Sequence, residues 1–89
     1  MNMPGQHPEV HIGEVYQHYK GGSYIVLGSG EHTENREPLI FYISMQDGRG
    51  YHRPAGMFLG VVKEGNSYIQ RFVLTGFIEI DLKINMQKG

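Results

Sequence analysis

The segment FIEIDLKINM, residues 77–86, alternates strictly between apolar and polar side chains. Successive side chains of a β-strand point to opposite faces, so the apolar set would share one face of a strand. That set comprises Ile78, Ile80, Leu82, Ile84 and Met86. No segment of the chain shows a convincing helical period, and this alternation therefore directs the prediction towards β-structure.

The other apolar segments are short, and glycine-containing turns separate them. Residues 23–28 (SYIVLG) and 39–45 (LIFYISM) combine strand-like length with β-branched side chains, and residues 67–74 (SYIQRFVL) continue in the same way. Turn signals lie at Gly21-Gly22, at Asp47-Gly48 and in the EGN triplet of residues 64–66. Strands joined by short turns predict an all-β fold, either a small barrel or a rolled sheet.

Composition limits the class of protein. A chain of 89 residues is enough for one domain, and it buries only about 60% of its unfolded surface. The absence of cysteine excludes disulfides, thiolate zinc sites and a cysteine nucleophile. Eight Lys and Arg against nine Asp and Glu leave no overall basic field to attract nucleic acid. No apolar run approaches the roughly 18 residues of a membrane span, and residues 1–10 lack signal-peptide features, so we expect a cytoplasmic protein.

The predicted domain organisation has three parts. Residues 1–9 form a flexible N-terminal arm, residues 10–76 the β-domain, and residues 77–89 a C-terminal strand or tail. A strand of ten residues would span roughly 33 Å, which is long for so small a domain. Its apolar edge either completes the fold within one chain or pairs with a second copy, which would remove an aggregation hazard. We expect a homodimer or a larger homo-oligomer.

Four short blocks follow one another in a characteristic order. They are Tyr16 with His18–Gly21, His32–Asn35, Arg53–Pro54 with Met57–Phe58, and Arg71–Phe72. Over residues 13–72 these blocks resemble the Y-x-H-Y-K-G, H-S-E-T, R-P-x-x-M-F and R-F motifs of a family of short bacterial and phage proteins, domain of unknown function 1653. Tyr51-His52 stands where that family usually has Trp-Val, and the chain after Phe72 has no counterpart. The resemblance implies a small SH3-like β-barrel, here with an added C-terminal strand, and it implies no function.

The block HYKGG, residues 18–22, has two interpretations. Lys20 and the amides of Gly21 and Gly22 could form a concave anion-binding corner, since Lys supplies charge and Gly lets a phosphate approach the backbone. The block could also be a strand end that enters a hairpin turn, where Gly permits a positive φ. The sequence leaves both interpretations open.

The block GRGYHRP, residues 48–54, is the stronger candidate for a ligand-binding loop. Arg49 and Arg53 offer planar recognition of phosphate or carboxylate, and Tyr51 could stack on a base. His52 can donate or accept a hydrogen bond and titrates near neutrality. The alternative is a surface loop with solvated arginines, in which Arg53 pairs with a carboxylate such as Glu34.

Metal binding and catalysis find little support in the sequence. His18, His32 and His52 could converge on zinc, yet nothing in their spacing demands it. No serine lies in a nucleophile elbow, no paired carboxylates lie in an apolar context, and there is no Walker loop or dinucleotide-binding fingerprint. We expect no cofactor. An enzyme ranks third among the functional classes, with His52 or Glu34 as its base.

The sequence therefore predicts a non-enzymatic binding module for a small anionic ligand, and a nucleotide is the ligand class that we expect. The predicted ligand-binding residues are His18, Tyr19, Lys20, His32, Arg49, Tyr51, His52, Arg53 and Met57. If the protein is viral, sequestering a host signalling nucleotide would be a reasonable role. The rival prediction is a protein- or nucleic-acid-interaction adaptor, whose aromatic groove would be formed by Tyr16, Tyr19, Tyr42 and Tyr51.

Overall fold

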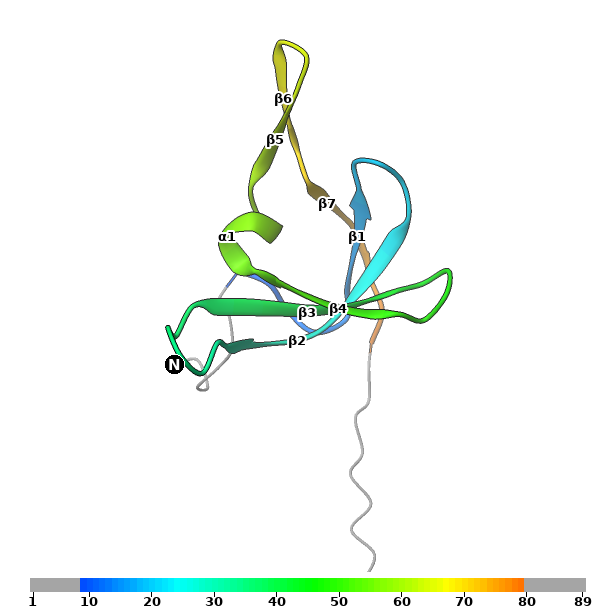
Figure 1. Cartoon of the computed structure of the whole chain (residues 1–89). Coiled ribbons are helices and arrows are strands. Elements are labelled where there is room, and N and C mark those ends of the chain that lie inside the picture. Colours follow the sequence, from blue (N-terminus) through cyan, green and yellow to red (C-terminus); the bar gives the residue numbers. More distant parts are fainter. Residues whose placement is uncertain (1–8, 80–89) are drawn as a thin grey trace, which may run out of the picture.

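The computed structural model describes residues 9–79, and almost all of their regular structure is β (Figure 1). The strands are β1 (Glu14–His18), β2 (Ser23–Glu31), β3 (Pro38–Ser44), β4 (Gly50–Pro54), β5 (Val61–Glu64), β6 (Ser67–Gln70) and β7 (Phe72–Phe77). A four-residue helix, α1 (Ala55–Phe58), lies between β4 and β5. The all-β prediction is confirmed. No helix within residues 9–79 is long and apolar enough to cross a membrane.

Five strands form one antiparallel sheet in the order β4-β3-β2-β1-β7, and β5 and β6 form a separate hairpin. Figure 1 shows this hairpin projecting away from the sheet. Strands β4 and β7 lie at the two edges of the sheet. They are not hydrogen-bonded to each other within residues 9–79, so the described part of the chain contains no closed barrel.

Strand β2 bends the sheet. Its first residues, Ser23 to Ile25, pair with β1, whereas nearly its whole length pairs with β3. A register shift between Val26 and Gly28 marks a β-bulge, and bulges bend a strand and increase its twist. As a result, β1 and β7 run at a steep angle to β3 and β4 (Figure 1). The bend allows side chains from both ends of the sheet to meet in one core.

The core lies between the bent sheet and α1. Its fully buried large side chains are Phe58, Ile40 and Val26. Phe58, which α1 supplies, stacks on Phe72 with ring centroids 4.3 Å apart and meets the ring of Tyr16 edge-on at 5.0 Å. The Tyr16 hydroxyl donates to Glu14 Oε1 at 3.1 Å. Burial, together with the negative charge of Glu14, raises the pKa of Tyr16 to about 12.

The block HYKGG ends β1 and forms the turn into β2. Gly21 and Gly22 have φ values of 109° and 88°, a region that residues with a Cβ rarely enter. The Gly21 N–H donates to the His18 carbonyl at 2.9 Å, and the His18 N–H donates to the Gly22 carbonyl at 3.0 Å. The hairpin-turn interpretation of this block is therefore confirmed.

Two segments differ from their predicted form. The predicted strand over residues 67–74 is divided at Arg71, whose N–H donates to Gly60 O and whose carbonyl accepts from Tyr19 N–H, both at 3.0 Å. The chain changes its neighbouring strand from β5 to β1 at this point. The prediction of a loop for GRGYHRP is also wrong for the last five of its seven residues, because Gly50–Pro54 pairs with β3 as strand β4.

The N-terminal arm and most of the C-terminal strand lie outside the described residues. Of the predicted arm, residues 1–9, the structure describes Glu9 alone. Of the predicted tail, Phe77 closes β7, and the Ile78 N–H donates to Gly13 O at 2.7 Å. The rest of the strand predicted for residues 77–86, and its role in a dimer, stay predictions.

Candidate functional site

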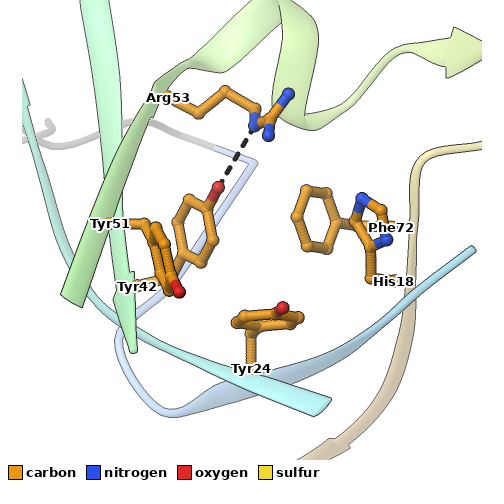
Figure 2. Close-up of a pocket in the computed structure, with 6 residues that line it drawn as sticks. All are labelled: His18, Tyr24, Tyr42, Tyr51, Arg53 and Phe72. Atoms are coloured by element: carbon orange, nitrogen blue, oxygen red, sulfur yellow. Dashed lines mark hydrogen bonds between the residues drawn. The ribbon is translucent and has the colours of Figure 1, made fainter. Parts of the chain in front are cut away.

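A pocket of about 130 Å³ lies beside the core, between β3 and β4 on one side and β1 and β7 on the other (Figure 2). Every strand of the five-stranded sheet contributes a side chain to its wall. The lining residues are His18 from β1, Tyr24 from β2, Tyr42 from β3, Tyr51 and Arg53 from β4, and Phe72 from β7. Five aromatic rings and one guanidinium group therefore surround the space.

Strand alternation and cross-strand pairing bring these side chains together. Tyr51 and Arg53 are two residues apart on β4, so they share the face that lines the pocket. Tyr42 pairs with Tyr51 across β3 and β4, and their rings stack with centroids 5.7 Å apart. His18 pairs with Phe72 across β1 and β7, and these rings meet edge-on at 4.9 Å.

Tyr24 lies at the bottom of the pocket as Figure 2 shows it. Its ring meets Tyr42, Tyr51 and Phe72 edge to face, with centroids 5.5, 6.1 and 5.8 Å apart. Such edge-to-face pairs are favourable beyond the area that they bury, and they fix the orientation of the rings. The wall is therefore largely aromatic, and Tyr42 and Phe72 within it also belong to the buried core, whereas Tyr51 is exposed.

Arg53 brings a positive charge to the mouth of this aromatic pocket. Its Nε–H donates to the Tyr42 hydroxyl at 3.1 Å, and its guanidinium carbon lies 6.0 Å from the centroid of the Phe72 ring (Figure 2). Within residues 9–79 the guanidinium makes no ion pair, and in particular none with Glu34. The hydrogen bond fixes the group while its terminal Nη atoms keep their donors for a ligand.

His18 lies on the opposite wall of the pocket, where neighbouring side chains surround it with positive charge. Burial lowers the pKa of its imidazole, and the positive charges of Arg53, Arg71 and Lys20 lower it further. The Nδ1 atom of His18 accepts the Lys20 backbone N–H at 3.1 Å, so the neutral ring carries its proton on Nε2. Every charged side chain that acts on this imidazole is a cation.

Three of the predicted ligand-binding residues, His18, Tyr51 and Arg53, line the pocket together. Two more lie next to it without lining it. The Tyr19 ring packs on His18 with centroids 4.7 Å apart, and the Lys20 ammonium lies 5.7 Å from the centroid of the Tyr19 ring. The structure thus brings five of the predicted residues to one region.

The other four predicted residues lie elsewhere. His52 sits between Tyr51 and Arg53 on β4 and therefore points to the opposite face, where its ring lies 6.2 Å from Phe41. Arg49 is exposed in the turn before β4, and its N–H donates to Asp47 Oδ1 at 3.0 Å.

His32 and Met57 do not line the pocket either. His32 lies in the loop between β2 and β3, where its Nδ1 accepts the Glu34 N–H at 3.2 Å. Met57 is an exposed residue of α1 whose carbonyl accepts the Arg71 Nε–H at 3.1 Å. Within residues 9–79 no three His, Asp or Glu side chains form a metal-binding group, so the three-histidine zinc site finds no support there.

Tyr24 and Phe72 are lining residues that the sequence prediction missed, and Tyr42 was assigned only to the groove of the adaptor alternative. One signal for Tyr42 is available in the sequence, because it lies two residues after Ile40 in the strongest buried-strand segment. Tyr24 similarly lies two residues before the buried Val26. Phe72 shares the pocket only because the chain changes partner at Arg71, which no local pattern indicates.

The fold and the site define a small all-β domain with an aromatic pocket lined by every strand of its five-stranded sheet. The chain belongs to the family described as protein of unknown function DUF1653, whose model matches residues 14–74, and the predicted family is confirmed. A crystal structure of a member of that family from Bordetella bronchiseptica is similar, with a TM-score of 0.67 and 25% identity over 82% of this chain and 96% of that one. No curated protein matches the chain significantly.

Proposed function

We propose that this protein is a non-enzymatic binding module whose aromatic pocket takes the flat ring of a small anionic ligand. A nucleotide is the class that combines such a ring with negative charge. The observation that carries this proposal is the guanidinium of Arg53, held by Tyr42 at 3.1 Å over an otherwise aromatic pocket. If the protein is viral, its role would be to sequester a host signalling nucleotide.

The sign of the surrounding charge favours an anion. Aromatic cages commonly recognise cations such as quaternary ammonium groups, because ring faces are electronegative. Here Arg53 already lies over the face of Phe72, and Arg71 and Lys20 add positive charge around His18. A second cation would meet repulsion of about 1–4 kcal/mol per contact at 4 Å, depending on the local dielectric, whereas an anion would gain a similar attraction.

The size of the pocket favours a ligand that inserts one ring. Sites that bury a whole drug-sized ligand measure about 300–1,000 Å³. At about 130 Å³ this pocket accommodates a single planar group, and the remainder of the ligand would lie outside it. Stacking of a base on an aromatic side chain contributes about 1–3 kcal/mol, and a charge-assisted hydrogen bond from Arg53 adds to it.

The chemistry of the lining favours binding over catalysis. The six lining side chains include no carboxylate, serine, cysteine or lysine, and the reactive groups among them are the imidazole of His18 and the tyrosine hydroxyls. Burial and the neighbouring cations lower the pKa of His18, which favours the neutral form of its imidazole. Its Nε2–H then acts as a fixed hydrogen-bond donor towards a ligand.

Isothermal titration with purified nucleosides and nucleotides tests the proposal. Arg53→Ala should weaken nucleotide binding by about tenfold or more, the loss expected for one charge-assisted hydrogen bond. Arg49→Ala is the matched control, because Arg49 lies in the exposed turn of the same hairpin. This variant should bind nucleotides as tightly as the wild type does. Unchanged affinity in an Arg53→Ala protein that still unfolds cooperatively would remove the basis of the proposal.

An interaction adaptor is the second candidate, and the β5–β6 hairpin is what favours it. The hairpin projects from the sheet (Figure 1), and Tyr68 and Val61 on it have 69% and 55% of their surface exposed. Exposed apolar side chains on a projecting element suit a macromolecular partner. Replacing both Val61 and Tyr68 by Ser should leave nucleotide binding unchanged if the pocket is the functional site. The same replacement should abolish partner binding if the protein is an adaptor.

A further inference from the structure

Two cationic side chains, Arg71 and Lys20, flank the pocket without lining it. Arg71 directly precedes the wall residue Phe72, and its carbonyl accepts the Tyr19 N–H at 3.0 Å. This bond ties the turn that carries Lys20 to the junction between β6 and β7. His18 also pairs with Phe72 across β1 and β7, so the backbones of both cationic residues adjoin the part of the wall that His18 and Phe72 form.

Side-chain contacts orient the guanidinium of Arg71 and bring the ammonium of the exposed Lys20 near the Tyr19 ring. The Arg71 Nε–H donates to Met57 O at 3.1 Å, which orients the guanidinium and leaves its two Nη atoms for a ligand. The Lys20 ammonium lies 5.7 Å from the Tyr19 ring centroid, and that ring packs on His18 at 4.7 Å. Within residues 9–79 neither cation forms an ion pair.

The arrangement keeps like charges close together, which costs stability unless an anion offsets it. Arg53 lines the pocket from β4, whereas Arg71 contacts Met57 of α1 and Lys20 lies near the ring of Tyr19, which packs on His18. All three act on the pKa of His18 as positive charges. A group of fixed guanidinium and ammonium donors with no described carboxylate among them is typical of a phosphate-binding surface.

We propose that Arg71 and Lys20 form a second subsite for the phosphate groups of a ligand whose ring occupies the pocket. This inference rests on the proposed function and makes it more specific. The ligand is then a phosphorylated nucleotide that extends from the pocket past His18, and the unphosphorylated nucleoside binds weakly. The small volume of the pocket agrees with this division, because it leaves the phosphates outside, where the two cations lie.

The test compares ligands that differ only in phosphate. The four ribonucleosides, their 5′-monophosphates and their 5′-diphosphates are titrated into the full-length protein by calorimetry at fixed salt. We expect the best nucleotide to bind at least tenfold more tightly than its nucleoside, since each charge-assisted hydrogen bond to phosphate contributes on that scale. Arg71→Ala should remove most of that difference and leave nucleoside affinity within about twofold.

Matched variants separate charge from structure. Arg71→Lys keeps the charge and should keep most of the preference for phosphate, which a purely structural role for Arg71 would not produce. Lys20→Ala should reduce the preference by a smaller factor. Lys63→Ala, on the exposed β5 strand, removes an equal charge outside the subsite and should change nothing.

The outcomes distinguish the two proposals. If nucleotides bind more tightly than nucleosides, Arg53→Ala weakens that binding, and Arg71→Ala and Lys20→Ala leave it unchanged, the pocket function stands and the phosphate subsite is overturned. If nucleosides and nucleotides bind equally well, both proposals fail. If none of these compounds binds, both proposals fail. Affinity that falls steeply with salt and grows with oligonucleotide length would overturn the small-ligand subsite in favour of a nucleic-acid surface.

Discussion

Replacing Tyr42 with Phe removes one oxygen atom and should free the guanidinium of Arg53. The Tyr42 hydroxyl accepts the Arg53 Nε–H at 3.1 Å, while the Tyr42 ring makes the aromatic contacts with Tyr24, Tyr51 and Phe58. Phe preserves the ring and therefore those contacts. The substitution thus isolates the hydrogen bond from the packing.

The structure sets the size of the expected effect. A hydrogen bond to a charged group contributes about 1.5–3 kcal/mol, but Arg53 is only half-buried, so water replaces part of the loss. We expect the free energy of unfolding to fall by about 1 kcal/mol. Ligand binding must then immobilise a freed side chain at a cost of about 0.5–1.5 kcal/mol, which weakens binding by about 2- to 12-fold.

A double-mutant cycle measures this effect directly. The free energy of urea unfolding is compared for the wild type, Tyr42→Phe, Arg53→Ala and the double variant. Tyr42→Phe should cost little once Arg53 is absent, giving a coupling of about 1 kcal/mol. If Tyr42→Phe destabilises the Arg53→Ala protein as much as the wild type, the hydroxyl does not hold Arg53 and the reasoning is refuted.

Three further predictions concern the pocket wall and the fold. Because the pKa of His18 in the folded protein lies below its ordinary value of 6.5, the unfolded chain binds the proton first, and the free energy of unfolding should fall as the pH drops below about 6.5. In a pH series of urea unfolding, His18→Asn should flatten this fall, and an unchanged slope would contradict the role of His18. Phe58→Ala should lower the free energy of unfolding by about 3–5 kcal/mol of the about 4–13 kcal/mol expected for the chain, and a thermal midpoint close to that of the wild type would show that Phe58 is not central to the core. Gly13→Ala should lower the free energy of unfolding more than Gly48→Ala does in the same assay. Both glycines have a positive φ, where Ala adds about 1–2 kcal/mol of strain, but only at Gly13 would the added Cβ overlap the Ile78 carbonyl, and equal effects would exclude that overlap.

Local patterns predict the strands of this protein well because its segments are short and its turns are clear. The apolar segments at residues 23–28 and 39–45 lie within β2 and β3, with only Met45 beyond the end of β3, and the two glycines of HYKGG adopt the positive φ values of the predicted turn. Each of these features depends on side chains close together in sequence. The resemblance to a known family was carried by equally local motifs, and it is confirmed over residues 14–74.

Only half of the residues that line the pocket could be predicted, because strand pairing decides which side chains face it. Tyr51 and Arg53 could be selected from their chemistry, but His52 between them points away once residues 50–54 form a strand. A loop imposes no alternation of side chains, whereas in strand β4 the side chain of His52 must lie on the face opposite to those of Tyr51 and Arg53.

The remaining wall residues depend on long-range geometry. Tyr24 lies in the first half of β2, and the bulge between Val26 and Gly28 sets how β1 and β7 are placed relative to β3. Phe72 reaches the pocket because the chain exchanges β5 for β1 as its neighbour at Arg71. Neither a bulge nor an exchange of partners leaves a clear periodic signal in one sequence.

Native mass spectrometry of the protein as purified from cells, followed by denaturation and analysis of what is released, tests the central claim most directly. The account predicts an added mass that is released as a phosphorylated compound with an aromatic ring and that is missing from the Arg53→Ala protein. The same spectrum reads the oligomeric state, which tests the predicted homo-oligomer. A bare wild-type protein that also gains no mass when nucleotides are added would contradict the account.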